Sequence, residues 1–160
     1  MGRLVIVPGD LLQSTETAIC HQVNCQNAMG SGVAKALYEK WPEVKEQYHK
    51  YCHGSTKPEQ LLGHVQAVNI NGKDIAHGGR FVINIFGQLN YGRDGKCYTR
   101  YDALETAFDK INYALAGYSL AFPYGFGCGL AGGDWATVYW LIRDHLYNTD
   151  ITIYRLVCPT

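Results

Sequence analysis

The sequence predicts an α/β fold in which helices cover both faces of a mixed, largely parallel central sheet of about six strands. Short apolar runs alternate with longer segments of helical spacing along the 160 residues. Twice, at 24–33 and at 122–135, a glycine-rich loop joins a strand to a helix. A turn-forming stretch at 70–74 separates the third strand from the fourth, which predicts one antiparallel pair.

The expected strands are rich in β-branched residues and are bounded by residues typical of turns. The first, Arg-Leu-Val-Ile-Val, ends before Pro8 and Gly9, and the second is the apolar run that leads into the first glycine loop. The next two flank the turn at 70–74, the fifth leads into the second glycine loop, and the last closes the chain. They are residues 3–7, 17–23, 63–69, 80–86, 119–122 and 151–157.

Four segments have the apolar spacing of helices. The first carries Val33, Ala34, Leu37 and Trp41, which fall on one helical face. The expected helices are residues 31–40, 43–53, 99–116 and 134–147. No internal repeat or low-complexity tract interrupts them, so we expect one domain spanning 1–160.

Composition narrows the possible partners and compartments. A hydrophobic content of 47% can build a core without disulfides, and 14 basic against 14 acidic residues give no broad positive field for a polynucleotide. The 6 cysteines form no close pair, so neither a zinc ribbon nor a redox motif is expected, and free thiols indicate a reducing compartment. The N-terminal apolar run is too short for a signal peptide, and no stretch is long enough for a membrane helix. We therefore expect a cytoplasmic protein, a monomer, with no membrane contact.

The loop from Asn24 to Val33 has the features of a phosphate site. Gly30 and Gly32 let the backbone approach a ligand closely, and the helix that follows offers unpaired N–H groups to an anion. An ordinary strand-to-helix turn is the alternative for this segment alone. A second loop, 122–135, has five glycines between Gly125 and Gly133, more than one turn requires. If the two preceding strands are neighbours, both loops open at their carboxyl ends and enclose a cleft, with the polar loop 87–98 as a possible third wall.

These loops, with Gly9-Asp10-Leu11-Leu12, the run His21-Gln22-Val23-Asn24, Trp135 and the last strand, resemble a macrodomain, the ADP-ribose-binding three-layer α/β/α module. The subgroup that it resembles contains the ADP-ribose 1''-phosphate phosphatases and the terminal ADP-ribose glycohydrolase-like proteins. The resemblance runs nearly end to end.

The resemblance assigns roles to particular residues. Asp10, with Leu11 beside it, would accept the adenine amino group, although a turn or N-cap aspartate is the alternative. Asn24 would bind the distal ribose, unless its amide only closes its own loop. Tyr154 would stack near adenine or else pack in the core. The loop residues that would hold the diphosphate from the two sides are Gly30, Ser31, Gly32 and Val33, and Gly127, Cys128, Gly129, Leu130 and Ala131.

His21 resembles the histidine that phosphatase-like members need for activity. We expect it to ionise near neutral pH and to position water or act as general acid or base at C1'' of the ribose, with a purely structural histidine as the alternative. Members that use a lysine and aspartate pair carry Asp directly after Gly-Cys-Gly-Leu, whereas Ala131 stands here. The lysine position is ambiguous between Lys96, Gln88 and Tyr98. Asp134 is a possible substitute carboxylate, but capping of the helix start is the better interpretation.

The resemblance therefore implies a hydrolase that acts at C1'' of ADP-ribose and dephosphorylates ADP-ribose 1''-phosphate. Alternatives are removal of ADP-ribose from modified protein or nucleic acid, and a non-catalytic reader of ADP-ribose. No cofactor and no metal is expected, because metal-ligand and P-loop motifs are missing from the sequence.

Overall fold

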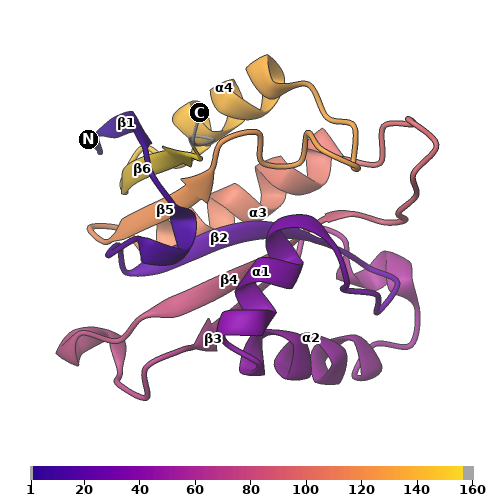
Figure 1. Cartoon of the computed structure of the whole chain (residues 1–160), viewed down its shortest axis with the longest axis horizontal. Helices are drawn as coiled ribbons and strands as arrows, with labels where there is room; N and C mark the ends of the chain where they lie inside the picture. Colours follow the sequence, from indigo (N-terminus) through magenta and orange to yellow (C-terminus); the bar gives the residue numbers. More distant parts are fainter. Residues whose placement is uncertain (1, 157–160) are drawn as a thin grey trace.

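The computed structural model describes residues 2–156 and shows a six-stranded sheet in the order β1-β6-β5-β2-β4-β3 (Figure 1). All neighbouring strands are parallel except β3 and β4, which are antiparallel. The predicted mixed, largely parallel sheet is thereby confirmed. The strands are β1 (Leu4–Pro8), β2 (Ala18–Asn24), β3 (Val65–Asn69), β4 (Phe81–Gln88), β5 (Ser119–Pro123) and β6 (Asp150–Arg155).

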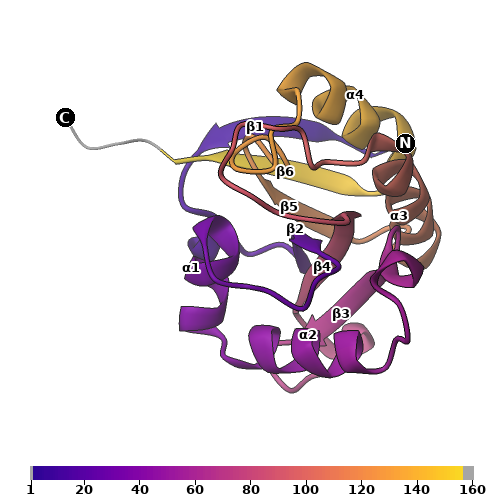
Figure 2. The same ribbon diagram turned by 90° about the vertical axis from the view of Figure 1, so that its right-hand side faces the viewer.

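Two helices cover each face of the sheet (Figure 2). They are α1 (Gly32–Lys40) and α2 (Glu43–His53) on one face, and α3 (Tyr101–Ala114) and α4 (Trp135–His145) on the other. Side chains alternate along β2, so that Ala18 and Cys20 face α3 and α4 while Ile19 and Val23 face α1 and α2. Both faces of β2 are therefore core, which explains why its first three residues, Ala18, Ile19 and Cys20, are all apolar.

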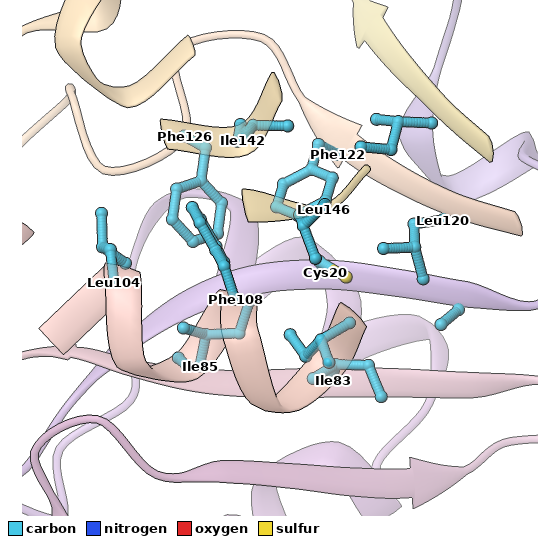
Figure 3. Close-up of a cluster of buried hydrophobic side chains, with 14 of the residues drawn as sticks. Cys20, Ile83, Ile85, Leu104, Phe108, Leu120, Phe122, Phe126, Ile142 and Leu146 are labelled. Atoms are coloured by element: carbon cyan, nitrogen blue, oxygen red, sulfur yellow. The ribbon is translucent and has the colours of Figure 1, made fainter. Parts of the chain in front are cut away.

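The core under α3 and α4 also anchors the second glycine loop. Phe126 lies within that loop and is only 2% exposed. Its ring contacts Phe122 of β5 at 5.3 Å and Phe108 of α3 at 6.0 Å between ring centroids (Figure 3). Burial of one aromatic side chain in the middle of the loop fixes the backbone on either side of it.

The core under α1 and α2 anchors the end of β2 in a comparable way. The fully buried Tyr48 of α2 donates a hydrogen bond from its hydroxyl group to the Asn24 carbonyl oxygen at 2.8 Å. The hydroxyl group also lies 3.0 Å from Asn24 Oδ1. This contact holds the last residue of β2 at the entry to the first glycine loop.

The ends of several predicted elements differ from the structure by a few residues. Gly63, at a φ of +85°, cannot continue a regular strand, so β3 begins at Val65. Thr99 bridges to Gln88, and α3 therefore begins at Tyr101. The connection from β3 to β4 includes the short 3-10 helix Ile75–His77 and is longer than the expected turn, although the strand pair is antiparallel as predicted. Two more 3-10 helices, Leu11–Gln13 and Pro58–Leu61, were not predicted, and the expected end of the last strand at 157 lies outside the described residues.

The five cysteines within residues 2–156 are free thiols, and Cys158 lies outside that range. Over the same residues, no helix combines the length and apolar character needed to cross a bilayer.

Candidate functional site

A cavity of about 790 Å³ opens where β2 and β5 end. The two strands pair in parallel, as the predicted cleft requires. His21 and the residues expected to bind ADP-ribose line this cavity, except Asp10, Leu11, Cys128 and Tyr154. Small-molecule sites typically enclose ~300–1,000 Å³, so the cavity can hold an extended ligand of nucleotide size.

The first glycine loop leaves donors free at the start of α1. Gly32 has a φ of +62°, a conformation that favours glycine, and open space surrounds the places where a Cβ would stand on Gly30 and Gly32. Ser31 is the N-cap residue, yet its side chain makes no capping hydrogen bond. The first N–H groups of a helix have no intrahelical partner, so this helix start can bind an anion from the cavity.

The Asn24 side chain closes the same loop. Its Nδ2 donates to the Ala28 carbonyl oxygen at 2.7 Å, and its Oδ1 accepts from the Gln26 backbone N–H at 2.9 Å. The structure therefore shows the alternative expected for Asn24, an amide that closes its own loop. The expected contact with a ribose stays a prediction.

The second glycine loop is held by its own backbone. The Gly133 N–H donates to the Gly127 carbonyl oxygen at 2.9 Å, and the Cys128 N–H donates to the Gly125 carbonyl oxygen at 2.8 Å. The Cys128 thiol lies 3.2 Å from the Phe126 carbonyl oxygen, and its pKa is raised to about 11 by burial. This thiol is protonated at neutral pH and is not a candidate nucleophile.

The predicted third wall is confirmed: Gln88, Tyr91, Gly92 and Arg93 line the cavity from the end of β4 and the loop after it. Gln88 was a candidate for the lysine position, whereas the sequence had not singled out the other three. Arg93 supplies the single guanidinium group of the described lining residues. A long polar loop directly after a strand end was the available signal, but the sequence did not tell which of its side chains turn inward.

A polar cluster joins this wall to the second glycine loop. Gln22 Nε2 donates to Gln88 Oε1 at 2.8 Å and to Thr99 Oγ1 at 2.9 Å, and the Thr99 hydroxyl donates to the Gly127 carbonyl oxygen at 2.6 Å. Gln22 thus connects the wall formed by Gln88 to the second glycine loop through Thr99. Its Oε1 is buried and has no hydrogen-bond partner among the described residues.

His21 lines the cavity from β2 but is only 1% exposed. Its Nε2 lies 2.5 Å from Asn84 Oδ1 of β4. Burial lowers the pKa of the imidazole to about 4, against a smaller opposite effect of the Asn84 hydrogen bond. The expectation that His21 ionises near neutral pH is therefore wrong, because the burial of its ring disfavours the charged form.

The remaining candidates lie outside the cavity lining. Lys96 is exposed, and its Nζ lies 3.8 Å from Asp94 Oδ2. Asp134 caps α4 by accepting from the Thr137 N–H at 3.0 Å, which confirms the capping interpretation. Asp10 caps the 3-10 helix after β1 through the Leu12 N–H at 2.9 Å, and the Tyr154 hydroxyl donates to Glu16 at 2.6 Å.

The lining of the cavity therefore has a distinct chemistry. Within residues 2–156 its ionisable side chains are His21, Tyr91, Arg93 and Tyr124, and it holds no carboxylate and no lysine. Nor do the described residues contain a group of three or more His, Cys, Asp or Glu side chains placed to hold a metal ion. The site offers backbone N–H groups, amides and one guanidinium group to an anionic ligand, and a neutral imidazole lies beside them.

Comparisons with known proteins give sequence relatives of two kinds. The DNA ADP-ribosyl glycohydrolase of Mycobacterium tuberculosis is 29% identical over 130 residues, which are 81% of this chain and 35% of that protein. The ADP-ribose 1''-phosphate phosphatase of Aspergillus oryzae is 33% identical over 63 residues, 38% of this chain and 31% of that protein. The chain thus spans about a third of the length of these curated relatives. No family model matches it.

Solved structures match nearly the whole chain. A protein of unknown function from Bacteroides thetaiotaomicron superimposes with a TM-score of 0.82 at 27% identity, over 96% of this chain and 98% of that one. A macrodomain protein from Streptomyces coelicolor gives 0.76 at 26% identity, over 95% and 98% of the two chains. DarTG from Thermosipho africanus, solved in complex with ADP-ribose, gives 0.76 at 20% identity, over 97% of this chain and 42% of that one.

Proposed function

Because this chain is a macrodomain by its fold and is similar in sequence to macrodomain hydrolases, we propose that it binds ADP-ribose and hydrolyses a bond at C1'' of the distal ribose. The first-choice substrate is ADP-ribose 1''-phosphate, which hydrolysis converts to ADP-ribose and inorganic phosphate.

The observation that carries the proposal is the pair of glycine loops at the ends of two paired parallel strands, facing one cavity. The uncapped start of α1 offers free N–H groups and the positive end of a helix dipole, both of which favour a diphosphate. Gly127, Gly129 and Leu130 approach from the opposite side. A diphosphate held between the loops would leave its two substituents to extend in opposite directions.

The order of the strands supports this extended pose. Asp10 follows β1, and Tyr154 lies in β6, which stands between β1 and β5. His21 lies on β2, on the other side of β5. A ligand with adenine near Asp10, Leu11 and Tyr154 and with its distal ribose near His21 would cross both loops. We propose this orientation, with the adenine beyond the rim of the cavity.

The chemistry of the lining favours a substrate that brings its own proton acceptor. No protein carboxylate lines the described cavity, and His21 with a pKa of about 4 is a weak base. The phosphate of ADP-ribose 1''-phosphate has oxygens that titrate near pH ~6 and can take the proton of the attacking water. His21 is proposed to act in its neutral form by orienting the distal ribose for this attack.

Removal of ADP-ribose from modified nucleic acid is the alternative reaction. It is favoured by the match to the DNA ADP-ribosyl glycohydrolase, which covers twice as much of this chain as the match to the phosphatase. A non-catalytic reader is the alternative from another class. It is favoured by the same lack of a carboxylate in the described lining.

Incubation of the purified protein with ADP-ribose 1''-phosphate, with phosphate release as the readout, tests the first choice. Parallel incubations with ADP-ribosylated DNA and ADP-ribosylated protein test the alternative substrates. Tight binding of ADP-ribose by calorimetry, without turnover of any of these, would establish the reader instead. Equal affinities for AMP and ADP-ribose would refute the binding of the diphosphate and distal ribose altogether.

We also propose that residues 1–160 form one domain that acts as a monomer. Light scattering coupled to size-exclusion chromatography tests the monomer, because a mass well above 17.8 kDa would contradict it.

A further inference from the structure

Three polar side chains cross the sheet beside the cavity in a single row. His21 of β2 is in register with Asn84 of β4, and Asn84 is in register with Gln66 of β3. His21 and Asn84 are 1% and 0% exposed. Their neighbours on this face of the sheet are apolar, for example Ile19, Val23, Val82 and Phe86.

A buried imidazole and a buried amide destabilise an apolar core unless they are hydrogen-bonded. The row satisfies most of these groups through a continuous chain of hydrogen bonds. Gln66 Nε2 donates to the Gln47 carbonyl oxygen of α2 at 2.8 Å, Asn84 Nδ2 donates to Gln66 Oε1 at 3.0 Å, and Asn84 Oδ1 faces His21 Nε2.

The chain of bonds has only one possible direction. A backbone carbonyl oxygen can only accept, so the Gln66 amide must point its NH₂ group at Gln47 and its oxygen at Asn84. Asn84 must then direct its own NH₂ group at Gln66 and its oxygen at His21. The His21 nitrogen that faces this oxygen has to be the donor, which fixes the neutral ring as the Nε2–H tautomer.

The other ring nitrogen of His21 is left as an acceptor. Nδ1 is buried and has no hydrogen-bond partner among the described residues, although His21 lines the cavity. In the Nε2–H tautomer, Nδ1 carries a lone pair. A lone pair attracts an O–H or N–H donor and repels the oxygens of an ionised phosphate.

We propose that Gln66 and Asn84 are positioning residues, which hold His21 in the Nε2–H tautomer so that Nδ1 accepts a hydrogen bond from a hydroxyl group of the bound distal ribose. The inference rests on the proposed binding of ADP-ribose and goes beyond it by assigning the group that faces His21. A sugar hydroxyl, and not a phosphate oxygen, lies against Nδ1. The diphosphate then occupies the glycine loops and cannot slide toward β4.

Nitrogen NMR of protein labelled with ¹⁵N in its 6 histidines tests the row directly. We expect His21 of the ligand-free protein to give the signals of the Nε2–H tautomer. Addition of ADP-ribose is expected to move the Nδ1 signal in the direction of an accepted hydrogen bond, whereas ADP, which has no distal ribose, leaves it unchanged. An Nδ1–H tautomer in the free protein overturns the proposal, as does an equal response to ADP.

Two variants of Gln66 separate positioning from mere stability. Gln66 does not line the cavity, and Gln66→Met removes the acceptor that orients Asn84 while keeping the side-chain length. We expect a mixture of His21 tautomers and an affinity for ADP-ribose lowered about 3- to 10-fold, the size of one hydrogen bond. Gln66→Glu keeps an oxygen opposite Asn84 and is expected to restore the tautomer. Equal tautomer spectra for Gln66→Met and wild type refute the role of Gln66.

Calorimetry on the wild type keeps the two hypotheses apart. If ADP-ribose does not bind, the proposed function and the hydroxyl contact fail together, while the tautomer of the free protein still decides the role of the row. If ADP-ribose binds and the Nδ1 signal does not move, the proposed function stands and the hydroxyl contact is refuted.

Discussion

The two glycine loops both join a strand to a helix, but they have different structural roles. In the first, open space surrounds Gly30 and Gly32, and the helix that follows begins without a side-chain cap. In the second, a Cβ on Gly132 would lie 2.6 Å from the Lys96 carbonyl oxygen, and the Asp134 side chain caps the next helix. The glycines of the first loop leave space for a ligand, whereas Gly132 and Gly133 of the second loop allow close packing of the backbone. Only the first loop leaves a helix start free to bind an anion.

The largest expected effect follows from the packed glycine of the second loop. Gly132 has a φ of +71° in addition to its contact with Lys96. Gly132→Ala is therefore expected to lower the free energy of unfolding by about 2–5 kcal/mol, through backbone strain and overpacking together. Urea denaturation measures this change. Gly30→Ala is the control, since open space surrounds that position, and it is expected to stay within ~0.5 kcal/mol of wild type. Similar losses in the two variants would contradict the distinction between the loops.

The first loop is expected to respond in binding instead. Gly32→Glu places a carboxylate where the diphosphate is proposed to lie, and two like charges ~4 Å apart repel by ~4 kcal/mol at an effective dielectric of 20. We expect the Kd for ADP-ribose to rise about 100-fold or more. Gly32→Ala has the same backbone conformation without the charge, and it separates the strain at a φ of +62° from the electrostatic effect. Unchanged affinity in Gly32→Glu refutes the phosphate site.

Between the loops, the burial of His21 predicts a loss of stability in acid. Its pKa is about 4 in the folded protein and about 6.5 in the unfolded chain, so between these values the unfolded state binds more protons. The contribution of His21 to the free energy of unfolding is fully present above pH ~6.5 and is lost as the pH falls to ~4. The total loss is ~3 kcal/mol.

Urea denaturation at several pH values gives the dependence of the free energy of unfolding on pH. The variant His21→Leu, which has no titratable group at this position, serves as the reference. The pKa values of His49 and His64 are also lowered by burial, so the difference between the two proteins is the quantity to compare. Parallel curves would mean that His21 is not buried in its neutral form.

The sequence predicted the elements whose structure depends on a single continuous segment. The strand-loop-helix unit around Gly30 and Gly32 depends on local chemistry, and both its strand and its helix lie within a residue or so of the prediction. The burial of His21 could not be predicted in this way, because it depends on the pairing of β2 with β4, which is distant in the chain. The same holds for Arg93, whose place at the cavity depends on how a long loop folds back.

The smallest expected effect tests the cap of the second loop. Asp134 was a possible substitute for a catalytic carboxylate, but its side chain accepts hydrogen bonds from the Thr137 N–H and hydroxyl and does not line the cavity. These bonds hold the pKa of the carboxyl group below its usual range. Asp134→Ala removes the cap of α4, and we expect a Tm lower by about 2–4 °C, as for the loss of one helix cap in a chain of this size. Asp134→Asn retains a capping oxygen and is expected to melt close to wild type.

Both variants should bind ADP-ribose as wild type does, since the helix start that faces the proposed diphosphate is that of α1. A large loss of turnover in both variants, at unchanged Tm in Asp134→Asn, would instead make Asp134 a catalytic carboxylate and would remove the distinction between the two loops.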